Sequence, residues 1–145
     1  MNYDPATVMA DLMIAKGFFT EHTGDTPLFI GELPLQIDNS LVGCIYHNGD
    51  EIIDKYTTGH SLVYNNIQLV IYSNEYAKGV KLLNAITDDL ELICNMIVLE
   101  DNGAKTLIKT IDTEVPATYI GRENDYNKFY GFYCTFVTIM EDIND

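Results

Sequence analysis

The chain has 145 residues, of which 22 are acidic and 8 are basic, so its formal net charge is −14. Binding nucleic acid through its phosphates requires clustered Lys and Arg, and this composition excludes such a basic patch. The hydrophobic content of 47% is that of a folded chain, which excludes a disordered protein. The length fits one domain, spanning residues 1–145. The acidity indicates a solvated surface, a surface that DNA passes without binding, or a mimic of DNA.

The sequence gives no sign of a membrane segment, a metal site or a catalytic site. No apolar run reaches the ~20 residues of a transmembrane helix, and the N-terminus lacks the basic start of a secretory signal, so we expect folding in the cytosol. Cys44, Cys94 and Cys134 are far apart and fit no metal or redox spacing, so we expect reduced, buried thiols. The histidines likewise fit no metal motif, and no nucleotide-binding or nucleophile motif is present. We therefore predict no catalytic, cofactor-binding or metal-binding residues.

The first elements follow from capping residues and spacing. Asp4 and Pro5 are typical of a helix start, and apolar residues three or four apart continue this helix to about Gly17. We expect short strands at 28–30 and 41–46, separated by irregular segments.

Residues 49–66 lose this regularity. Gly and Asn residues typical of turns alternate there with apolar and aromatic ones, which predicts either a long loop or an extended hairpin. An apolar segment that cannot reach its own core is a candidate for burial on another subunit. The residues that we assign to a subunit or tube interface are Ile52, Ile53, Tyr56, Leu62, Val63 and Tyr64.

The segment after this region is the expected centre of the fold. Residues 67–72 are almost wholly apolar, which predicts a strand that is covered on both faces. Ser73 or Asn74 should cap the following helix, with Glu75 in its first turn, where the helix dipole favours an anion. The apolar stripe from position 76 to 93 predicts a helix of roughly 28 Å, at 1.5 Å per residue.

The remaining chain is rich in strand-forming residues. We expect residues 96–99 to form a short strand or the exit of the helix, strands at 107–111, 115–120 and 129–140, and a loose acidic tail at 141–145. The sum is two helices and six or seven strands, with the helices ahead of the first and fourth strands. This order predicts an α+β fold, a mainly antiparallel β-sheet with two helices packed against it.

Four stretches, taken in order, resemble one protein family. They are DPATVMADLMIAKGFF, LFIGELPLQIDNSLVGCIY, NNIQLVIYSNEYAKGVKLLNAITDDL and PATYIGRENDYNKFYGFYCTFV. This layout is similar to that of the minor capsid or tail-completion proteins of long-tailed bacteriophages, the tail-terminator group. In that family's closing "P..IG.DE" turn, this chain has Arg122 where an Asp usually precedes the Glu. It also has Tyr72 and Ser73 where the family often carries Arg.

The resemblance implies a tail-terminator-like fold and a structural virion protein without catalysis or cofactor. Such proteins form a ring, commonly a hexamer, at the head-proximal end of the tail. The ring caps the tail tube protein, stops its polymerisation and presents a surface to the head–tail connector protein. DNA would pass through the lumen without specific binding, and no membrane partner is implied. We expect assembly in the host cytoplasm and a final location in the virion.

Two alternatives stay open. One is another head–tail connector component, a stopper or adaptor, since connector proteins also form rings. The other belongs to a different class, an acidic DNA mimic that inhibits a DNA-binding protein. The mimic fits the charge but not the strand–helix motifs.

Overall fold

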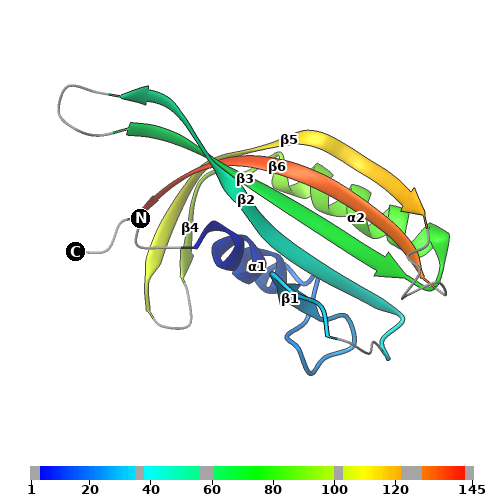
Figure 1. Cartoon of the computed structure of the whole chain (residues 1–145). Coiled ribbons are helices and arrows are strands. Elements are labelled where there is room, and N and C mark those ends of the chain that lie inside the picture. The colour runs from blue at the N-terminus through cyan, green and yellow to red at the C-terminus, as the bar shows by residue number, and fades with distance from the viewer. Residues whose placement is uncertain (1–3, 35–37, 56–60, 100–102, 122–128, 143–145) are drawn as a thin grey trace.

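The computed structural model describes residues 4–34, 38–55, 61–99, 103–121 and 129–142, with only the backbone for residues 51–55, 61–63 and 142. The described residues form a six-stranded sheet and two helices, a mixed α+β architecture. Figure 1 shows that the sheet is curled. The elements in chain order are α1 (Pro5–Ala15), β1 (Leu28–Ile30), β2 (Leu41–Lys55), β3 (Ser61–Ser73), α2 (Tyr76–Leu90), β4 (Cys94–Leu99), β5 (Lys105–Gly121) and β6 (Tyr130–Asp142).

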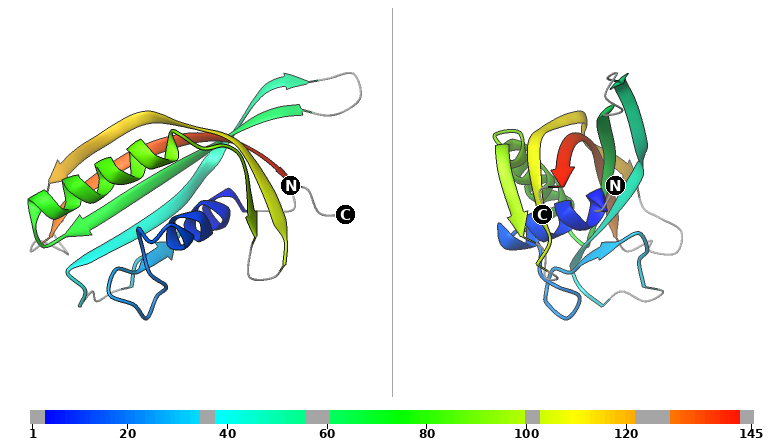
Figure 2. Two further views of the ribbon diagram at one scale, coloured as in Figure 1. Left: turned by 180° about the vertical axis from the view of Figure 1, so that it is seen from behind. Right: turned by 90° about the vertical axis from the view of Figure 1, so that its left-hand side faces the viewer.

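The sheet has the strand order β1-β2-β3-β6-β5-β4. β1 pairs parallel to β2, and the other four neighbouring pairs are antiparallel. The prediction of a mainly antiparallel sheet with two helices is therefore confirmed. Seen from behind, both helices lie on the same face of the sheet (Figure 2).

α1 begins as its sequence predicts. Asp4 is the N-cap, and one carboxylate oxygen accepts from the Ala6 N–H at 3.3 Å while the other accepts from the Thr7 hydroxyl at 2.8 Å. The helix packs against β1, β2, β3 and β4. Because β1 and β4 are the two edges of the sheet, the sheet curls around α1.

The start of α2 differs from the prediction. Its N-cap is Glu75, and no side chain caps the helix. The Ser73 hydroxyl instead accepts from the Glu75 N–H at 3.2 Å and donates to the Glu75 carbonyl at 2.8 Å. Ser73 therefore fixes the turn between β3 and α2 rather than the first helical turn. The helix also ends at Leu90, before the predicted end at 93.

The core lies between the helices and the concave face of the sheet. Ile67, Leu69 and Ile71 of β3 are fully buried there. On the opposite face, Val70 and Tyr72 belong to a smaller buried cluster that includes Val42 and Phe129. The prediction that the central strand is covered on both faces is therefore confirmed.

Several strands are longer than their sequence patterns predict. The segments 107–111 and 115–120 form one strand, β5, whose pairing with β6 shifts register at four places. These bulges absorb extra residues without ending the strand, and Pro116 lies within this irregular region. The prediction of a loose tail at 141–145 is wrong for Glu141 and Asp142, which belong to β6 and pair with Leu107 and Thr106 of β5. Residues 143–145 lie outside the described residues.

Candidate functional site

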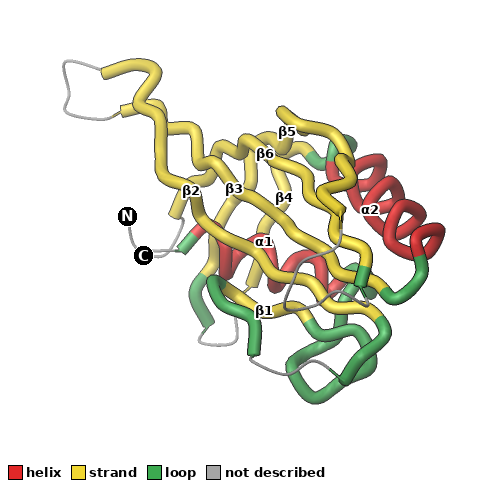
Figure 3. Tube along the Cα trace, turned by 45° about the vertical axis from the view of Figure 1, so that its right-hand side comes forward, coloured by secondary structure: helices red, strands yellow, loops and turns green. Residues whose placement is uncertain are grey.

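β2 and β3 continue beyond the body of the sheet as a two-stranded arm. Their pairing runs from Leu41↔Ser73 to Lys55↔Ser61, whereas β6 joins β3 only as far as Asn65↔Thr138. Residues 51–55 and 61–64 therefore pair only with each other within the described residues, and Asp50 pairs with Asn65 at their base. We call the segments 50–55 and 61–64 the arm. Figures 1 and 3 show the arm projecting away from the sheet and both helices. Of the two sequence interpretations of residues 49–66, the extended hairpin fits the described residues.

A bulge sets the point where the arm leaves the sheet. The register passes from His47↔Ile67 to Asp50↔Asn65, so β2 carries one more residue than β3 between these pairs. Gly49 takes φ +97°, a conformation that L side chains rarely adopt. His47 Nε2 lies 2.7 Å from Asp50 Oδ1, which closes the bulged segment. Such bulges bend a strand and change the direction of the residues beyond the bend.

Side-chain amides connect the two strands at the same place. Asn48 Nδ2 donates to Gln68 Oε1 at 3.3 Å, and Asn66 Nδ2 donates to the Gly49 carbonyl at 3.4 Å. These bonds hold the bulge from both strands. The polar residues between 47 and 50, which as a sequence indicate only turn chemistry, therefore form the base of the arm.

Asn65 lies beneath this base in a fully buried position. Its exposure is 0%, and neither amide atom has a hydrogen-bond partner among the described residues. Thr138, its neighbour on β6, is also buried with an unpartnered hydroxyl. An unpaired buried polar group costs about 1–3 kcal/mol, so this row of the sheet is destabilised where the arm begins.

The arm brings most of the predicted interface residues together. The backbone register sets Ile52 opposite Val63 and Leu62 opposite Asp54, and Ile53 falls at a second register shift. Tyr64 is half-buried. Tyr56 lies outside the described residues.

A second apolar surface follows β4, and the sequence did not identify it. Ile97 is 58% exposed and Leu99 is 65% exposed, while Leu92, just before the strand, is 83% exposed. β4 pairs with β5 on one side only, so its other edge has no partner strand in the described structure. No residue from Cys94 to Leu99 is charged. The residues were predicted to form a strand, but periodicity in so short a run does not reveal which side remains uncovered.

A third exposed patch lies at the start of α2. The Tyr76 ring packs edge-on against Tyr119, Tyr130 and Phe132, with centroids 5.4, 5.8 and 5.3 Å away. Tyr76 and Tyr119 are half exposed, and Ile120 beside them is 42% exposed. These contacts join α2, β5 and β6 at one end of the sheet.

The shifted ionisable groups are held neutral by burial. Burial raises the pKa of the Cys134 thiol to about 12 and also raises the pKa of the Cys44 thiol. The pKa of Tyr46 is raised by burial and by its hydrogen bond with Cys44. Raised values describe thiols and a phenol that keep their protons, in contrast to the lowered pKa of an activated nucleophile.

The described part of the chain also has a hollow beside α1. This open hollow of about 290 Å³ lies between α1 and the segment that leads to β1, with Asp11, Glu21 and His22 among its lining residues. No three His, Cys, Asp or Glu side chains there or elsewhere in the described residues are grouped so that they could hold a metal ion. Neither α1 nor α2 combines the length and apolar character of a membrane-spanning helix.

No protein-family model and no curated protein sequence matches this chain. Its function is therefore inferred from the arm, the β4 edge and the charge.

Proposed function

We propose that the chain is a tail-terminator protein, a structural subunit that forms a ring on the end of a phage tail tube. The observation that carries this proposal is the pair of unlike surfaces on one subunit, the projecting arm and the uncovered β4 edge. Contacts between unlike patches are heterologous, and they close into rings when the rotation between copies permits. The proposed ring contains six copies, stops tube growth and provides the surface that the head–tail connector binds.

The charge supports a ring that conducts DNA. Each subunit carries a formal net charge of −14, so a ring presents a strongly acidic assembly to passing DNA. Phosphates bind Lys and Arg, and an acidic lumen therefore offers few contacts that would hold DNA.

Electron microscopy of tails assembled without this chain tests termination. Tubes longer than those made with the chain are expected, since nothing would stop their polymerisation. Tails of normal length that fail to acquire heads would contradict termination. They would favour the alternative function, a stopper or adaptor that only joins tail to head.

The acidic charge also favours a second candidate, a DNA mimic that occupies the basic site of a DNA-binding protein. Light scattering separates the two candidates. A mimic stays monomeric or dimeric and binds a basic partner tightly. A terminator forms larger closed assemblies as its concentration rises or when tail tubes are added.

A further inference from the structure

We propose that the β3 strand of the arm from one copy adds to the free edge of β4 in the next copy. The paired segments are Ser61–Tyr64 and Met96–Leu99. This inference rests on the proposed ring and names its subunit contact, an intermolecular extension of the sheet. The occupant of the β4 edge is thus a second copy of this chain.

β4 has the properties of an edge made for pairing. Its regular ladder with β5 runs from Met96↔Ile108 to Leu99↔Lys105, while Asn95 takes φ 55° and interrupts the ladder between Cys94 and Met96. Exposed apolar edge strands promote unwanted association, and proteins commonly protect them with charge, Pro or short length. Met96–Leu99 has neither charge nor Pro, so its four residues are an unprotected edge.

The other edges of the sheet are protected. β1 is only three residues long. Where β5 runs beyond β4, it carries Asp112, Glu114 and Pro116, which oppose pairing with another strand. Because β1 and the far part of β5 are protected and β4 is not, we assign strand addition to β4 among these edges of the described sheet.

The arm offers a matching strand. Its β2 side is interrupted by register shifts at 47–50 and 52–54, which disrupt regular pairing along that side. Its β3 side, Ser61–Tyr64, is four residues long, uncharged and rich in strand-forming residues. β6 pairs with β3 only from Asn65 onward, so the outer edge of Ser61–Tyr64 lacks a partner strand in the described structure.

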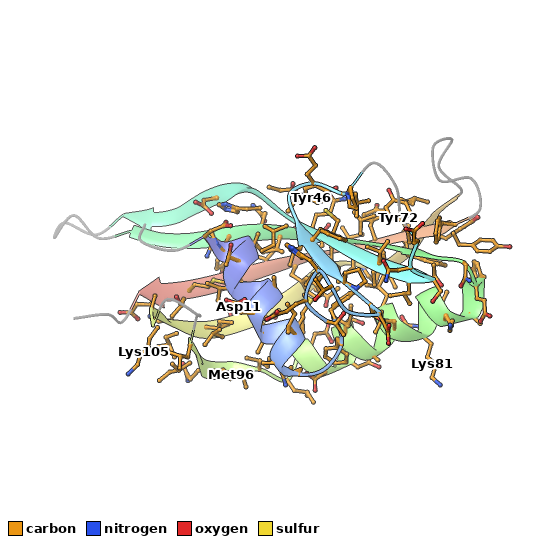
Figure 4. All side chains as sticks on the ribbon, turned by 90° about the horizontal axis from the view of Figure 1, so that it is seen from below. Asp11, Tyr46, Tyr72, Lys81, Met96 and Lys105 are labelled. Carbon is orange, nitrogen blue, oxygen red and sulfur yellow. The ribbon has the colours of Figure 1, made fainter. Side chains whose placement is uncertain are left out.

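Charge favours contact through the β3 side of the arm, because both copies are acidic. Like-charged subunits repel, and an uncharged strand against an uncharged strand avoids placing carboxylates together. The β2 side of the arm carries Asp50, Glu51 and Asp54, whereas Met96–Leu99 carries no charge. On β5 beside β4, Lys109 already forms an ion pair with Glu141, 3.2 Å away. Figure 4 shows Met96, Lys105 and Lys81 along one side of the molecule, opposite Tyr46 and Tyr72. In the docked arrangement, β3 of the arm and β4 lie between the acidic β2 strand and the neighbouring sheet, so the acidic strand of the arm lies away from that sheet.

A cross-linking experiment on the full chain tests the contact. Leu62→Cys and Ile97→Cys are made separately in a Cys94→Ser background, because Cys94 is exposed while Cys44 and Cys134 are buried. The two variants are mixed at ring-forming concentration and treated with a short bismaleimide. A covalent dimer is expected from the mixture, with at least tenfold less from either variant alone. Ile30→Cys replaces Ile97→Cys in the control, since Ile30 is 42% exposed at the opposite edge of the sheet.

A second variant provides an independent readout. Ile97→Lys places a charge on an exposed position of the edge, so the subunit should still fold but should lose ring assembly in light scattering. Ile30→Lys should assemble like the unmodified chain. Equal cross-linking through positions 30 and 97, or no cross-link between 62 and 97, overturns the strand-addition inference.

The same samples distinguish the two proposals. If rings form but positions 62 and 97 do not cross-link, the proposed ring stands and only the contact between the arm and β4 is rejected. If the chains neither cross-link nor assemble at any concentration or on tail tubes, both the contact and the proposed ring are rejected.

Discussion

At the scale of single residues, Asn65 is a buried amide without a partner among the described residues, at the root of the arm. Leu has a similar shape and no polar atoms, so Asn65→Leu should raise the free energy of unfolding by about 1–3 kcal/mol. Chemical denaturation measures this change. Asn66→Leu is the matched control, because Asn66 donates to the Gly49 carbonyl and its loss should bring no gain. A destabilised Asn65→Leu variant would indicate that Asn65 has a partner.

The Cys134 thiol predicts a pH dependence of stability. Burial raises its pKa from 9.0 to about 12, so the folded chain retains a proton that the unfolded chain releases. The stabilisation by this group is therefore complete below pH 9 and is lost as the pH rises toward 12. Over this range the loss is at most about 1.4 kcal/mol per pH unit.

Cys134→Ala should make the decline of unfolding free energy above pH 9 less steep. Cys94→Ala, at an exposed position, should leave the slope unchanged. Denaturation curves at several pH values compare the three proteins. Identical slopes for the unmodified chain and Cys134→Ala would contradict a buried, neutral thiol.

Some residue roles follow from sequence and others do not. The Asp4 cap was predictable because capping depends on residues within one turn of helix. Ser73 was assigned to a cap on the same reasoning, but its hydroxyl forms the β3–α2 turn. Buried thiols were expected for all cysteines, yet Cys94 is exposed because β4 lies at an edge of the sheet.

At the scale of elements, Gly49 controls the base of the arm. Gly49→Val places a β-branched residue at φ +97°, which costs about 1–2 kcal/mol. We expect faster amide hydrogen exchange in 50–55 and 61–64, unchanged exchange in α2, and impaired ring assembly. Hydrogen exchange with mass spectrometry measures the first two effects.

Gly17→Val is the matched control for this prediction. Gly17 has φ +83° and lies at the end of α1, away from the bulge. The substitution introduces similar backbone strain but should leave exchange in the arm unchanged. If both variants change arm exchange equally, the bulge does not hold the arm.

The order and type of elements were predictable because both helices and the central strand have strong local patterns. The extent of the hairpin was not predictable, since the pairing of 47–55 with 61–67 passes through two bulges that interrupt the alternation. The bulges in β5 also interrupt the alternation, so the sequence predicted two strands where the structure has one. The interface residues in 49–66 were identified by apolar character in a turn-rich segment, whereas the exposure of β4 depends on its place in the sheet.

At the scale of the whole molecule, the charge opposes self-association. Each added copy brings a formal charge of −14. Salt shortens the range of this repulsion from about 30 Å at 0.01 M to about 3 Å at 1 M. Assembly should therefore begin at a lower protein concentration in high salt, as measured by light scattering. Dissociation of assemblies on adding salt would show that charge attraction dominates the contact instead.

The arm and the uncovered β4 edge of one subunit are unlike surfaces. Contacts between them predict a closed ring of subunits. Negative-stain electron microscopy of the purified chain at high concentration, combined with mass measurement, is the sharpest test of such an assembly. We expect annuli with a central hole and a mass of about six times the 16.4 kDa chain. Particles that remain single chains or two-fold dimers at every concentration, with and without tail tubes, would contradict the proposed ring.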